Sequence, residues 1–65
     1  MALLSEFYGS GEYSLRRASV HKEDDKLIVV LVDNLKIVEE RDLSNHSLVF
    51  AEDTAENWVI GVIQI

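Results

Sequence analysis

The sequence predicts an α+β fold: a three-stranded antiparallel β-meander followed by a C-terminal α-helix that packs on one face of the sheet. Two observations support this prediction. The last third of the chain carries an apolar stripe at helical spacing, and the middle carries an apolar run between turn-forming residues. A small SH3- or Sm-like β-barrel is the alternative, and it requires residues 59–65 to form a strand.

The helix is predicted over residues 47–64. Its stripe consists of apolar residues at alternating spacings of three and four: Leu48, Ala51, Ala55, Trp58, Val62 and Ile65. Ser47 is a good N-cap residue, and Trp58 in the middle of the stripe is expected to anchor the core. Gly61 either ends the helix as its C′ residue or lies inside it. Because the stripe continues beyond Gly61, we favour a helix that runs through it.

The β-meander is predicted over residues 13–43. Residues 13–21 have the composition of a strand, residues 26–32 are almost entirely β-branched or leucine, and residues 35–41 form the returning strand. Asp33 and Asn34 are expected to form a two-residue hairpin turn, because both residue types tolerate positive φ. A three-residue turn at Glu23 to Asp25 is expected to join the first two strands.

The register of these strands decides which face of the sheet meets the helix, because neighbouring side chains of a strand point to opposite faces. With the turns above, Ile28, Val30 and Val32 are expected to face the helix. Ala18 and Val20 are expected to lie beside them in the core.

The central strand is apolar on its other face as well, which is typical of a strand that is buried on both sides. One helix covers only one face of a sheet, so we expect a second subunit to cover the other. The helix also carries apolar residues away from its stripe, which is typical of an interface. The predicted interface residues are Leu27, Val29, Leu31, Val38, Val49 and Ile60. A homodimer or a larger ring is expected.

Residues 1–12 are predicted to form an N-terminal arm, because Gly9-Ser10-Gly11 interrupts regular structure. The arm is expected to pack on its own domain or to dock on a neighbouring subunit. With the meander and the helix it makes one small domain, residues 1–65. A domain of this size buries only about 60% of the surface that its unfolded chain exposes, and oligomerisation is a common way to compensate.

The net charge of −6 argues against a general nucleic-acid binder. All six basic residues lie between Arg16 and Arg41, however, so a basic patch on the sheet, with Arg16 and Arg17 as phosphate contacts, is the alternative function. The chain has no cysteine, and its longest apolar run, residues 27–32, is far too short to cross a bilayer. We recognise no signal peptide and expect a cytoplasmic protein without membrane association.

No catalytic, cofactor-binding or metal site is predicted. His46 has Asp42 and Glu52 nearby in sequence, but no second histidine is close and no nucleophile is placed beside it. The acidic residues of the predicted helix, among them Asp53 and Glu56, are typical of a solvated helix face. We therefore expect no enzymatic activity.

Three short segments, Met1–Tyr8, His46-Ser47 and Ala51–Trp58, resemble small proteins of marine cyanophages and ocean metagenomes. The resemblance covers about a third of the chain and brings no activity with it. It implies a phage accessory protein that acts in a bacterial cytoplasm. We expect a small, acidic, homo-oligomeric interaction protein whose further partner is a host or phage protein.

Overall fold

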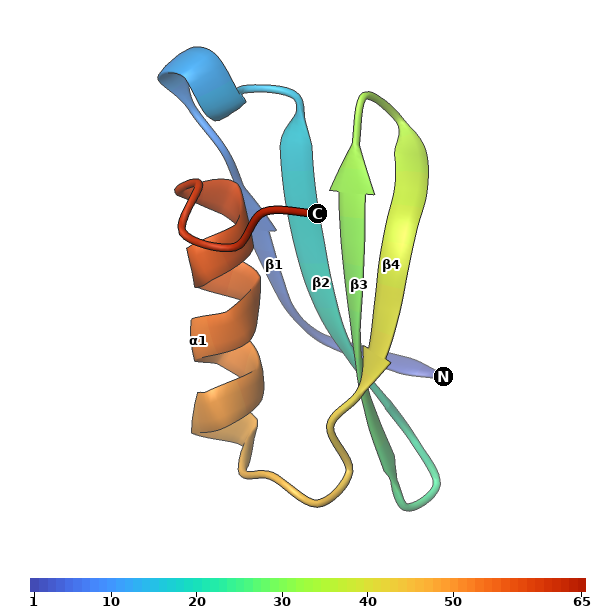
Figure 1. The fold of residues 1–65 in the computed structure, drawn as a ribbon. Coiled ribbons are helices and arrows are strands. Elements are labelled where there is room, and N and C mark those ends of the chain that lie inside the picture. Colours follow the sequence, from blue (N-terminus) through green and yellow to red (C-terminus); the bar gives the residue numbers. More distant parts are fainter.

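The computed structural model, which describes residues 1–65, contains one open antiparallel sheet and one α-helix (Figure 1). The strands β1 (Ala2–Tyr8), β2 (Arg16–Glu23), β3 (Lys26–Asp33) and β4 (Lys36–Asp42) lie side by side in chain order. A short 3-10 helix, η1 (Gly11–Tyr13), joins β1 to β2, and the helix α1 (Leu48–Val59) follows β4. The α+β prediction is confirmed, but the sheet has four strands rather than three. The alternative of a closed barrel is wrong.

The additional strand is β1, which lies within the residues predicted to be an arm. It pairs with β2 in antiparallel fashion, with Phe7 opposite Ala18. Gly9 belongs to the connection between the two strands, and a side chain there would collide with the backbone carbonyl of Tyr13. The Gly-Ser-Gly segment therefore marks the link between two paired strands rather than the end of a loose arm.

Both hairpin turns differ by one residue from the prediction. Glu23 pairs with Lys26, so the first turn is Asp24-Asp25 and not a three-residue turn. In the second hairpin Asp33 pairs with Lys36, so the turn is Asn34-Leu35. Asn34 and Leu35 have φ values of 53° and 68°, as a type I′ turn requires, although leucine rarely adopts this conformation.

The shifted turns place the opposite face of β3 under the helix. Val29 and Leu31 are fully buried, whereas Ile28, Val30 and Val32, predicted to meet the helix, lie on the other face. The predicted burial of Ala18 and Val20 is confirmed. The core consists of four residues from the sheet and four from the helix: Ala18, Val20, Val29, Leu31, Ala51, Ala55, Trp58 and Val59.

Helix α1 begins as predicted and ends earlier. The Ser47 hydroxyl caps it by accepting a 3.1 Å hydrogen bond from the Phe50 amide. At the other end Gly61 has a φ of +86°, and its amide donates to the Trp58 carbonyl while the Val62 amide donates to that of Asn57. This is a Schellman motif, so the prediction of a helix to residue 64 is wrong.

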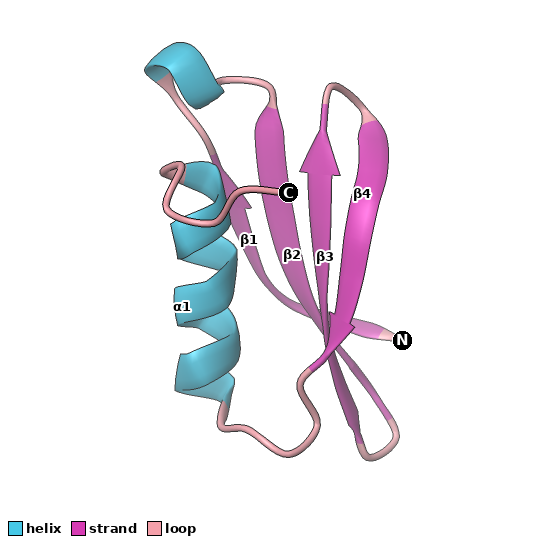
Figure 2. Cartoon of the chain, viewed as in Figure 1, coloured by secondary structure: helices cyan, strands magenta, loops and turns pink.

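Residues 60–65 turn back from the end of α1 toward β2 (Figure 2). Trp58, the predicted core anchor, is 2% exposed, and its indole N–H donates to the Val32 carbonyl at 3.1 Å. No helix in the structure is long and apolar enough to span a membrane.

Candidate protein-interaction surface

The face of the sheet opposite α1, which we call the open face, has no element packed on it (Figure 1). Its centre is an apolar stripe formed by Ile28, Val30 and Val32 of β3 together with Ile37 of β4. The three β3 residues are half-buried by neighbouring side chains of the sheet, and Ile37 is 62% exposed. An apolar stripe that nothing covers, on a chain this short, is the feature that a binding partner would bury.

One flank of the apolar stripe lies on β2 and carries hydrogen-bond donors and a cation. Arg17, Ser19 and His21 alternate with the buried residues of this strand and therefore share the open face. The Ser19 hydroxyl and the His21 Nε2 atom are 2.7 Å apart. Arg17 is exposed and forms no salt bridge within the chain.

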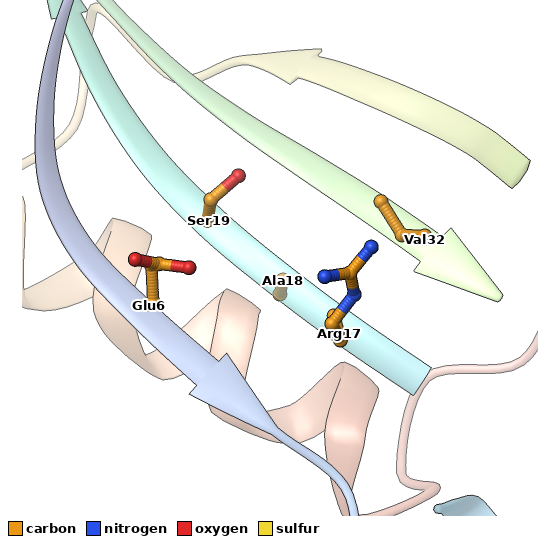
Figure 3. Close-up of a pocket in the computed structure, with 5 residues that line it drawn as sticks. All are labelled: Glu6, Arg17, Ala18, Ser19 and Val32. Carbon is orange, nitrogen blue, oxygen red and sulfur yellow. The ribbon is translucent and has the colours of Figure 1, made fainter. Parts of the chain in front are cut away.

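A depression of about 160 Å³ lies beside this flank and is lined by Glu6, Arg17, Ala18, Ser19 and Val32 (Figure 3). Figure 3 shows Arg17 extending from β2 toward Val32, with Glu6 on the neighbouring strand. The Glu6 carboxylate accepts a 2.7 Å hydrogen bond from the Tyr8 hydroxyl. That hydrogen bond raises the pKa of Tyr8, because it holds the phenolic proton against a negative charge.

The other flank lies on β4 and is acidic. Glu40 pairs across the sheet with Val30, and Asp42 pairs with Ile28, so both carboxylates share the open face. The hydroxyl and the amide of Ser44 both donate to Asp42, the amide at 3.0 Å. These two hydrogen bonds lower the pKa of Asp42, because they stabilise its charged form.

Two of the predicted interface residues belong to the core of the chain itself. Val29 and Leu31 are fully buried under α1 and have no surface to offer a partner, whereas Leu27 is half-buried against the same core. The physical reason is the one-residue shift of the turns, which exchanges the two apolar faces of β3.

The remaining predicted interface residues are exposed but lie away from the apolar stripe on β3. Val38 is 40% exposed and has no partner on β3, because a β-bulge leaves it between two paired residues. Val49 and Ile60 are more than half exposed on and just beyond α1, where Asp53 and Glu56 separate them. The two residues therefore do not form one continuous apolar patch.

The side chain of Arg16, which was predicted to contact phosphates, makes its contacts within the chain. Its guanidinium lies 3.9 Å from the ring centroid of Trp58 and 4.8 Å from that of Tyr13. Its Nη1 atom donates to the carbonyls of Trp58 and Ile63 at 2.9 and 3.0 Å. Arg16 therefore holds the end of α1 and the C-terminal segment on the sheet, and the side chain is not free to bind a nucleic acid.

The sequence around His46 does not assemble into a site. The imidazole stacks on the Phe50 ring at a centroid distance of 4.0 Å. The carboxylate of Glu52, which lies near His46 in the sequence, instead accepts a hydrogen bond from the Ser5 hydroxyl on β1. No group of three or more His, Cys, Asp or Glu side chains is placed so that it could hold a metal ion.

Comparison with protein-family models, with curated proteins and with solved structures gives no match for this chain. The open face is thus described by its own residues alone: an apolar stripe between a donor-rich flank and an acidic flank.

Proposed function

We propose that the protein is a small, acidic, non-catalytic interaction module that binds a protein partner through its open face. The observation that supports this proposal is the apolar stripe. Its β3 residues alternate with the buried residues Val29 and Leu31, and no helix or strand covers them. Its three β3 residues are β-branched, stiff side chains that lose little conformational freedom when a partner packs on them.

The composition of the open face favours a protein partner over a nucleic acid. Arg17 is the one basic residue in the flank on β2 besides the imidazole of His21, and three carboxylates share its face: Glu6, Glu40 and Asp42. A nucleic-acid interface carries a surplus of cations, because affinity for the phosphate backbone depends on their number. A second copy of the chain, or a host or phage protein in a bacterial cytoplasm, is the class of partner that we propose.

Photo-crosslinking tests this proposal. A benzophenone amino acid is introduced at Ile37 in the apolar stripe, and in a separate variant at Val49, a control residue of similar exposure on α1. After irradiation in cells that make the protein, we expect an adduct of defined mass from position 37 and none from position 49. Adducts from position 49 alone, or none from either, would contradict the proposal.

A further inference from the structure

We infer that the partner that covers the open face is a second copy of this chain, related to the first by a twofold axis that runs along β3. This inference rests on the proposed function and names the partner for the same surface. It follows from how the charges of the open face are arranged on either side of the apolar stripe.

The strand registers arrange the open face in three rows, each crossing β2, β3 and β4. The rows are His21–Ile28–Asp42, Ser19–Val30–Glu40 and Arg17–Val32–Ile37. In every row the β3 residue is apolar. Both charged positions on the β4 side are acidic, and the β2 side supplies a cation, a hydroxyl and an imidazole. The β2 side of the stripe therefore carries the cation Arg17 and neutral polar groups, with Glu6 beyond them on β1, whereas the β4 side is acidic.

A twofold axis along β3 lays the β2 side of each subunit over the β4 side of the other. The apolar stripe then packs on itself, and rows of equal height meet. His21 faces Asp42 of the partner subunit, and Ser19 faces Glu40 of the partner subunit. An isologous interface must be complementary to itself, and this arrangement satisfies that condition.

Other twofold arrangements bring like charges together. An axis that runs across the strands places Glu40 over its own copy and leaves Arg17 with no carboxylate opposite it. An axis between β2 and β3 places Glu6 over Glu40 of the partner subunit. Like-charge contacts of this kind disfavour association, so the charge pattern selects the axis along β3.

The principal charged groups of this interface are free to form it. The two salt bridges in the chain join Arg16 to Asp33 and Arg41 to Glu39, and neither involves Arg17 or Glu40. Packed sheets lie about 10 Å apart, and a one-row offset along the strands adds about 7 Å. An arginine and a glutamate side chain together span that separation, so Arg17 reaches Glu40 of the partner subunit.

The size of the open face predicts a weak dimer. With the axis along β3, only β2, β3 and β4 of each subunit overlap with the partner. Three strands spaced about 4.8 Å apart, each with about seven residues at about 3.3 Å, make a patch of roughly 330 Å² in projection. Two such patches fall at the low end of specific interfaces, below about 1,200 Å² in total. We therefore expect dissociation in the micromolar range rather than a permanent dimer.

Charge exchange between two variants tests this inference. Arg17→Glu places two carboxylates against each other in its homodimer, and Glu40→Lys places two cations against each other. Each variant alone is expected to dimerise at least about tenfold more weakly than the wild type. In an equimolar mixture, the carboxylate introduced in one variant meets the ammonium group introduced in the other, and the native Arg17–Glu40 contact forms once. Dimers are therefore expected to return to about the wild-type level.

Glu56→Lys is the matched control, because it reverses a charge on the exposed surface of α1 and is expected to leave dimerisation unchanged. Association is measured by sedimentation, and circular dichroism checks that each variant is folded. A wild type that stays monomeric, or variants that do not recover on mixing, would overturn the inference. The wild-type measurement holds even if a variant fails to fold.

The photo-crosslinking experiment separates this inference from the proposed function. An adduct from position 37 with a mass other than that of two chains would remove the second copy as partner and keep the open face as a binding surface. The absence of any adduct would remove both.

Discussion

Arg16→Ala is the substitution that tests most sharply how the end of the helix is held on the sheet. The Arg16 side chain is 11% exposed, and its guanidinium donates to two backbone carbonyls and to the Gln64 side chain. It also lies over the Trp58 ring. Removing it leaves these acceptors without their donor and opens the Trp58 ring to water.

The expected loss is about 2–3 kcal/mol in the free energy of unfolding. Hydrogen bonds that involve a charged group contribute about 1.5–3 kcal/mol each, and a cation over an aromatic ring contributes about 0.5–2 kcal/mol. These contributions overlap, and water replaces part of them, so the total stays below their sum. A domain of this length has a stability of about 3–10 kcal/mol, so the loss is a large part of it.

Urea denaturation followed by Trp58 fluorescence measures this loss, and thermal denaturation should show a midpoint lower by about 10–20 °C. Arg17→Ala is the matched control, because the neighbouring arginine is exposed on the open face and should change the stability by less than about 0.5 kcal/mol. Both are measured at a concentration where the chain is monomeric. Equal effects of the two substitutions would show that Arg16 does not hold the helix end.

Three further predictions concern the turns. Gly61→Ala should lower the free energy of unfolding by about 2 kcal/mol or more, because Gly61 has a φ of +86° and a side chain there would collide with the Tyr13 ring; an unchanged urea midpoint would contradict this. Leu35→Gly should raise stability by about 1 kcal/mol, because Leu35 is 84% exposed and adopts a φ of 68° without packing in return; a loss of stability would show that the turn differs. Ser44→Ala should raise the pKa of Asp42 toward its ordinary value of 3.8, as a carboxyl NMR titration can measure. Because the folded pKa is lowered, the contribution of Asp42 is present above pH 3.8 and fades as the pH falls through the lowered value; identical titration in both proteins would rule out this role of Ser44.

The parts of the fold that depend on local chemistry were predictable from the sequence. The apolar stripe of α1 and its Ser47 cap are both properties of a few consecutive residues, and both are present in the structure. The end of the helix was not predictable in this way. Val62 and Ile65 continue the spacing of the stripe but are each 66% exposed, because Gly61 adopts a left-handed conformation and Arg16 holds the segment that follows.

The face of the sheet that meets the helix could not be decided by hydrophobicity. Residues 27–32 are apolar on both faces, so only the position of the turns distinguishes the two. Asp33-Asn34 has better turn residues than Asn34-Leu35, yet the chain uses the second pair and accepts a leucine at positive φ. The packing of Val29 and Leu31 against α1 stabilises this register, and that contact is not visible in local sequence.

The existence of an uncovered apolar face was predictable although its residues were not. A β3 strand that is apolar on both faces, beside a single helix, leaves one face exposed in either register. The structure assigns that exposure to Ile28, Val30 and Val32 instead of the alternate residues of the strand. The strand β1 was not predicted from the sequence, because an irregular Gly-rich connection separates it from β2, the strand with which it pairs.

Whether the open face is an interface between copies of the chain is decided by the solution mass of the wild-type protein, measured by light scattering over a wide range of concentration. We expect a mass that rises from 7.4 kDa in dilute solution to twice that value at high concentration. A mass of 7.4 kDa at every concentration would contradict self-association through this face.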